Sequence, residues 1–328
     1  MMQPFKQMLR LSPAEASFAR RGFAETDPAV RARLERVIRT FIGGYALALE
    51  TPEPARLAER LDAEFDAHHA GFAYEGAGFY LALMDALWPA GPSRLRAFTD
   101  GPGRHQDYIA TVGAGFALAR VPWGRWTLHP TMRRLDPLLA WCVPDGAGFH
   151  DGFFHPRRYV EGQGGAPAGW PAWARQLFDS GLGRSLWWSQ GADPARLRVA
   201  IGGFAEDRRA ELWCGVGVAL AYAGGIDAEA VAAVADAAGP YRADLASGIP
   251  FAAEMRRKGG NPSAWTDGVC RALLGCAPGE AATLVLRERD ALLAAEPEHD
   301  PRAGGRIYPA LRRRLRRRLE TPSAPLTV

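Results

Sequence analysis

The chain has 328 residues, of which 48% are hydrophobic and 23% are charged, a balance typical of a globular protein with a large core. Its longest apolar runs, such as residues 216–223, are far shorter than the ~20 residues that cross a bilayer, so we expect no membrane span. The chain has a net charge of +4, and eight arginines lie between Arg302 and Arg318. The rest of the chain therefore has a net charge of −4, which argues against a body that binds nucleic acid.

Helix signals begin early in the chain. Ser12-Pro13 and Asp27-Pro28 each pair an N-cap residue with a proline, which favours a helix start. The second helix is expected to reach about Glu50. Apolar residues at helical spacing predict further helices near 51–72, 74–87, 94–98 and 107–119.

Residues 122–169 interrupt this pattern, because they are rich in proline, glycine and aromatic residues. We expect an irregular insertion with long ordered loops, where functional groups often gather. Helix signals resume at Trp170. They predict helices over 173–178, 193–204, 208–222, 227–238, 241–257, 263–274 and 278–295. No sustained alternation of apolar and polar residues predicts a strand, so the fold class is all-α.

Glycine-led segments recur through the sequence. They start at Gly43, Gly76, Gly113, Gly146, Gly181, Gly215 and Gly248, at spacings of 33, 37, 33, 35, 34 and 33 residues. A period of about 34 residues is typical of stacked helix pairs. We therefore expect a tetratricopeptide-like α/α superhelix over residues 1–300, with small residues at the start of each unit's first helix.

Residues 301–328 form a separate Arg-rich C-terminal helix and tail in this prediction. Leu311, Leu315 and Leu319 lie at i, i+4 spacing between two arginine triplets. One interpretation is a capping helix that covers the last repeat while its arginines face water. The alternative is a helix that binds an anionic partner or a membrane surface.

The densest polar cluster contains His150, Asp151 and His155, beside Phe149, Phe154 and Tyr159. A histidine and a carboxylate held among aromatic rings have perturbed pKa values, which acid–base catalysis requires. The alternative is hydrogen bonding within a Gly-rich loop. Spacing of i, i+5 places the two histidines on different helix faces, so we expect no metal site.

Three further polar residues are candidate catalytic groups: Glu75, His105 and Arg184. Glu75 lies in the apolar segment GFAYEGAGF, so it either pairs with an arginine of the next unit or stands in a cavity. Aromatic walls suited to an apolar or conjugated ligand are expected from these predicted ligand-binding residues: Phe149, Phe154, Tyr159, Trp187, Trp188, Trp213 and Tyr222. In the alternative interpretation these rings fill the core. P-loop, GxSxG, HExxH and dinucleotide signatures are missing, so we expect no cofactor.

Several blocks together resemble a family found in the gene clusters of enediyne polyketides. They are GFAYEGAGFYLALMDAL, VGAGFALAR, DGAGFHDGFFH, GLGRSLWW, ELWCGVGVALAYAGG and GIPFAAEMRRKGGN, and the resemblance runs from about Gly71 to Gly275. It implies an accessory protein that acts beside a polyketide synthase on a linear polyene.

The sequence therefore leads to two main hypotheses, beside a third in which the Arg-rich tail binds nucleic acid. The first is a cytoplasmic protein that binds an apolar polyene intermediate, has a polyketide synthase or another pathway protein as partner, and assists a proton-transfer or cyclisation step. The second is a non-catalytic scaffold for a partner enzyme or carrier protein. A deep pocket in which the polar candidates converge favours the first, and an open concave face favours the second.

Overall fold

The computed structural model describes residue 7 and residues 9–295 and 304–320, and all its secondary structure is helical. No strand occurs within these ranges, so the all-α prediction is confirmed. The long helices are α3 (Pro28–Glu50), α5 (Ala70–Leu87), α7 (Asp107–Arg120), α9 (Cys142–Phe154), α10 (Ala172–Ser189), α12 (Glu206–Tyr222), α14 (Arg242–Lys258) and α16 (Pro278–Ala295).

Shorter helices connect the long ones. They are η1 (Pro13–Ala16), α2 (Phe18–Arg21), α4 (Pro54–Glu64), α6 (Arg94–Asp100), η2 (Arg104–Gln106), η3 (Gly124–Trp126), α8 (Leu128–Met132), the π-helix η4 (Arg157–Glu161), α11 (Pro194–Gly202), α13 (Ala228–Ala238), η5 (Gly239–Tyr241) and α15 (Ala264–Leu274). Across the described residues, no helix by itself has the length and apolarity to cross a bilayer, although α15 and α16, bent by 70° at their junction, meet that criterion together.

The proline signals act as local helix starts. Asp27 caps α3, because its Oδ1 accepts hydrogen bonds from the backbone N–H groups of Ala29 at 2.8 Å and Val30 at 3.1 Å. Pro28 then occupies the first turn, where its missing N–H costs nothing. Asp193 caps α11 in the same way, through the N–H of Arg196 at 2.8 Å.

The long helices pack side by side in chain order, from α3 through α5, α7, α9, α10, α12 and α14 to α16. The recurring glycines lie in the middle of these helices and not at their starts, which corrects the sequence prediction. Gly78 of α5 faces the backbone of α7, where a Cβ would overlap the carbonyl oxygen of Ala110. Gly113 of α7 faces α5 in return, so the two backbones touch at a reciprocal pair of glycines.

The same reciprocal contact joins each neighbouring pair from α3 to α14. The glycine pairs are Gly44 with Gly76, Gly78 with Gly113, Gly115 with Gly146, Gly148 with Gly181, Gly183 with Gly215, and Gly217 with Gly248. In each GxG block the first glycine faces the preceding helix and the second faces the following one. The spacing seen in the sequence is therefore the spacing of helix–helix contacts.

The row curls until the end of α14 meets the starts of α5 and α7. Lys258 Nζ lies 2.6 Å from Asp107 Oδ2, and Gln106 Nε2 donates to the carbonyl oxygen of Gly259 at 3.2 Å. Arg256, buried at the same end, donates to the carbonyl oxygen of His68 at 2.6 Å. The curl brings the two ends of the α5–α14 part of the row together.

Residues 122–169 contain one of the long helices. α9 has the row's GxG block at Gly146 and Gly148, so its glycines serve close packing and do not form a loop. The irregular parts lie on either side of it. The proline, glycine and aromatic content of this segment predicted long loops, because the sequence does not distinguish a turn glycine from a packing glycine.

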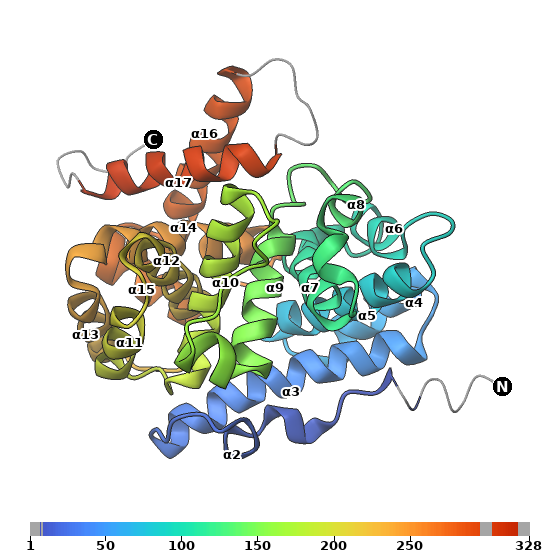
Figure 1. Cartoon of the computed structure of the whole chain (residues 1–328), viewed down its shortest axis with the longest axis horizontal. Coiled ribbons are helices and arrows are strands. Elements are labelled where there is room, and N and C mark those ends of the chain that lie inside the picture. Colours follow the sequence, from blue (N-terminus) through green and yellow to red (C-terminus); the bar gives the residue numbers. More distant parts are fainter. Residues whose placement is uncertain (1–6, 8, 296–303, 321–328) are drawn as a thin grey trace.

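The C-terminal helix α17 (Gly304–Glu320) crosses the body near α16 (Figure 1). Leu311 and Leu315 are buried against an apolar cluster that includes Leu177, Phe251 and Leu284, as the capping interpretation predicts. Its arginines are not simply solvated: Arg312 is buried and pairs with Glu211 at 3.3 Å. Arg314 and Arg318 pair with Glu288, and Arg316 pairs with Asp244. Residues 301–303 and 321–328 of the predicted tail lie outside the described residues.

Candidate ligand pocket and polar centre

A cavity with aromatic walls lies between α3 and the helices α5, α7, α9 and α10. The free space inside it is narrow, about 30 Å³. Its walls carry polar groups only at Glu15, Glu75 and Arg184. The other lining residues are apolar: Leu11, Val37, Ile38, Phe41, Ile42, Phe72, Phe116, Phe149, Phe153, Phe154 and Trp188. The lining is therefore almost wholly apolar, with a few polar groups among aromatic rings.

The polar groups of this pocket belong to a buried ion cluster. Arg184 of α10 lies between two carboxylates, with Nη2 3.2 Å from Glu75 Oε1 of α5 and Nη1 hydrogen-bonded to Asp145 Oδ1 of α9. All three side chains are nearly inaccessible to water. The guanidinium carbon of Arg184 also lies 5.0 Å from the ring centre of Phe149. Three helices thus bring together residues that are remote in sequence.

Two carboxylates share one cation here, so their protonation is perturbed. Burial raises the pKa of Glu75 to about 7, with Asp145 adding to the effect and Arg184 opposing it. Burial also raises the pKa of Asp145. A carboxyl group with a pKa near neutrality exchanges a proton readily at physiological pH, which is the property of a general acid or base.

The rings around the pocket form a continuous series. Phe41 contacts Phe116 at 5.0 Å between ring centres, Phe116 contacts Phe149 at 5.4 Å, and Phe149 stacks on Phe153 at 5.7 Å. Trp188 meets Phe149 edge to face at 5.2 Å. These contacts hold the walls in fixed orientations, so the pocket is preformed.

The predicted ligand-binding residues divide into two groups. Phe149, Phe154 and Trp188 line the pocket. The others do not: Trp187 and Trp213 are buried in the core, and Trp187 donates its Nε1–H to the carbonyl oxygen of Gly224 at 2.9 Å.

Tyr222 and Tyr159 lie in other surroundings. The ring of Tyr222 contacts Phe72 and lies 4.2 Å from the guanidinium carbon of Arg256. Tyr159 packs against Phe178, and burial, followed by the charge of Asp151, raises its pKa to about 12.

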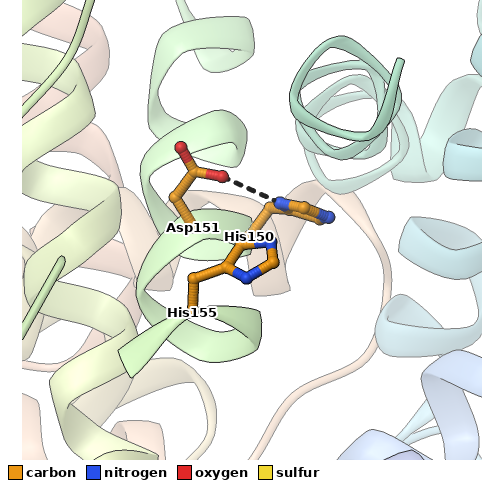
Figure 2. A group of neighbouring side chains, drawn as sticks. All are labelled: His150, Asp151 and His155. Carbon is orange, nitrogen blue, oxygen red and sulfur yellow. Dashed lines mark hydrogen bonds and ion pairs between the residues drawn. The ribbon is translucent and has the colours of Figure 1, made fainter. Parts of the chain in front are cut away.

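His150, Asp151 and His155 form a second polar cluster at the end of α9 (Figure 2). His150 Nδ1 lies 3.1 Å from Asp151 Oδ1, and a potential ligand atom from each of the three residues lies within 4.8 Å of the others. The prediction that the two histidines point apart is wrong. His155 is the C-cap of α9, with φ −130° and ψ 51°, so the chain leaves the helix there and its ring turns back toward His150.

This second cluster lies behind one wall of the pocket. The ring of His150 contacts Phe116 and Phe154, both of which line the pocket, while His150 itself does not. His105 takes no part in either cluster. It lies in η2, where its ring contacts Tyr74 and its Nε2 lies 3.5 Å from Asp62.

Sequence reasoning missed Asp145, although a signal was present. Glu75 precedes Gly76 in EGAGF, and Asp145 precedes Gly146 in DGAGF. The two carboxylates therefore occupy the same position in two related blocks. Because these blocks lie on helices that flank α7, one arginine from α10 reaches both carboxylates.

The fold and the pocket define an all-α protein with a row of glycine-packed helices around an internal aromatic cavity and a carboxylate–arginine centre. A family model described as "Protein of unknown function (DUF1702)" matches residues 2–319. The chain belongs to this DUF1702 family. No curated protein and no solved structure matches it.

Proposed function

We propose that this protein binds an apolar polyene intermediate of natural-product biosynthesis, of the enediyne polyketide kind, and assists its proton-transfer or cyclisation chemistry. The observation that carries the proposal is Glu75, a buried carboxyl group with a pKa of about 7 in the wall of an aromatic cavity. The resemblance of the glycine-led blocks to a family from enediyne gene clusters supplies the substrate class.

The lining of the cavity suits a conjugated chain by its chemistry. Rings from α3, α5, α7, α9 and α10 face one another across it, and they offer flat apolar surfaces to a planar polyene. Few polar groups interrupt these surfaces. A ligand without hydrogen-bonding groups therefore leaves few polar groups of the wall without a hydrogen-bond partner.

Glu75 is the proposed acid–base group. In its protonated form it transfers a proton to one carbon of the conjugated chain, and the resulting carboxylate stays beside Arg184 Nη2. The carboxylate then accepts a proton from another carbon, so that a double bond has moved and Glu75 is regenerated. Arg184 stabilises the charge on Glu75 while Asp145 holds the guanidinium in place.

The proposal also includes a repeat architecture for the chain. The units of about 34 residues are interpreted as tetratricopeptide-like helix pairs whose row curls around the aromatic space. A polyketide synthase would then deliver the polyene to the opening of the cavity, near Leu11 and Glu15.

Binding is tested with cis-parinaric acid, a conjugated tetraene whose fluorescence rises in an apolar site. Val37→Phe fills the pocket and should lower the affinity at least tenfold. Val121→Phe, in a different cavity beside α7 and α8, is the matched control and should leave the affinity unchanged. Equal affinities of the two variants would reject this pocket as the site.

Chemistry is tested separately from binding. In the producing strain, Glu75→Gln should abolish or strongly reduce the polyketide product while the protein level and parinaric acid affinity stay normal. Undiminished product would exclude Glu75 as the acid–base group, and the protein would then act as a binding scaffold.

A further inference from the structure

We propose that His150, Asp151 and His155 bind one divalent transition-metal ion. This site is separate from the pocket centre of Glu75 and Arg184, and its existence does not depend on the proposed function. Two imidazoles and one carboxylate are a ligand set that suits first-row divalent ions such as Fe²⁺, Co²⁺ and Zn²⁺.

The spacing of the ligand atoms fits an ion. His150 Nδ1 and Asp151 Oδ1 lie 3.1 Å apart. Two ligands at right angles around an ion, each at about 2.1 Å, are separated by about 3.0 Å. The third ligand atom, from His155, lies within 4.8 Å of the other two, so a change of side-chain rotamer brings it into the same shell.

The backbone holds the three residues in this arrangement. His150 and Asp151 are adjacent in the last turns of α9, and the N–H of His155 donates to the carbonyl oxygen of Asp151 at 3.0 Å. That bond closes the final helical turn while the φ and ψ of His155 turn its side chain back toward His150. Figure 2 shows the three side chains converging on one space.

The ring of His150 is held in place by its aromatic neighbours. It is 3% exposed and is held by Phe116 and by Phe154, whose ring centre lies 4.8 Å away. This packing fixes one ligand of the proposed site before an ion binds.

His155 makes the proposed metal site accessible from solvent. His150 is buried, Asp151 is partly buried and His155 is exposed, so the site reaches from the interior to the surface. Three protein ligands leave coordination positions for water or another ligand on the exposed side. Within the described ranges, no other group of three histidine, cysteine or acidic residues has ligand atoms so close together.

The four cysteines do not compete strongly for a metal. Cys142, Cys214, Cys270 and Cys276 are all free and buried. Burial raises the pKa of each thiol, which disfavours the thiolate that binds metal.

The test uses the full chain, freed of any purification tag and stripped of metal with a chelator. Titration with Co²⁺ should give d–d absorption bands that saturate at one ion per chain, and Zn²⁺ should displace the Co²⁺. Isothermal titration with Zn²⁺ gives the affinity independently. His155→Ala is the primary variant, because an exposed side chain can be removed without disturbing the core, and it should weaken Zn²⁺ binding at least tenfold.

Two further variants make the result specific. Asp151→Asn should weaken binding in the same way, whereas His105→Ala should leave it unchanged, because His105 pairs with Asp62 outside the cluster. Substoichiometric binding by the wild-type chain would overturn the proposal. So would equal affinities of His155→Ala and wild type, with circular dichroism confirming that both are folded.

Discussion

Glu75 and Arg184 are 109 residues apart in the chain, yet Arg184 Nη2 lies 3.2 Å from Glu75 Oε1 in the wall of an aromatic cavity. Asp145 on α9 shares the same guanidinium. Two carboxylates and one cation, all buried, make an arrangement in which one carboxyl group holds its proton near neutral pH. The proposed chemistry rests on this proton.

Stability should depend on pH through Glu75. Its pKa is about 7 in the folded chain, against an ordinary value of 4.5. Between these values the unfolded chain releases the proton that the folded chain retains, so stability falls as pH rises from 4.5 to 7. The contribution of this one group is about 3 kcal/mol over that range.

Urea unfolding of wild type and Glu75→Gln at pH 4.5 and 7.5 measures this effect. The variant has no proton to lose, so its stability relative to wild type should increase with pH. Glu59→Gln, at an exposed position on α4, is the control and should show a flat difference. A difference for Glu75→Gln that changes in the opposite direction would mean that Arg184 keeps Glu75 ionised.

The glycine contacts between helices predict a strong asymmetry between similar substitutions. Gly78→Ala should destabilise the protein by about 2–3 kcal/mol or more, because its Cβ would overlap the backbone of Ala110. Gly268→Ala, inside α15 with no neighbour within 4 Å, should stabilise it by about 0.5–1 kcal/mol. Chemical denaturation measures both, and similar effects for the two variants would argue against backbone contact at Gly78.

The C-terminal helix should depend on Arg312, whose side chain is buried. Arg312→Met leaves Glu211 and Ser247 without their partner and should cost about 3–5 kcal/mol. Arg313→Met, at the next and exposed position, should change stability by less than about 0.5 kcal/mol. Equal effects in urea unfolding would mean that the arginines act only through their summed charge.

The two adjacent tryptophans of α10 should respond differently to ligand. Trp188 lines the pocket, whereas Trp187 is buried in the core and bonded to Gly224. Trp188→Phe should weaken parinaric acid binding by about threefold or more, because it removes part of an aromatic wall. Trp187→Phe should change the affinity by less than about twofold, as measured by fluorescence titration, and a larger effect there would place the ligand elsewhere.

The sequence by itself determined the helical class and the position of most helices. Proline after an N-cap residue, as at Asp27-Pro28, acts within one turn, and apolar spacing along a helix is a local property. It also revealed the spacing of the glycine blocks and identified Glu75, Arg184 and His150. These features are visible because each depends on residues close together in the chain.

Only the tertiary structure decided how these features meet. The packing of Gly78 against α7, the pairing of Glu75 and Asp145 through Arg184, and the separation of Trp187 from Trp188 all depend on which helix lies beside which. The turn of His155 toward His150 depends on where α9 ends. A periodic sequence shows that contacts repeat, but the curl of the row sets which side chains share its interior.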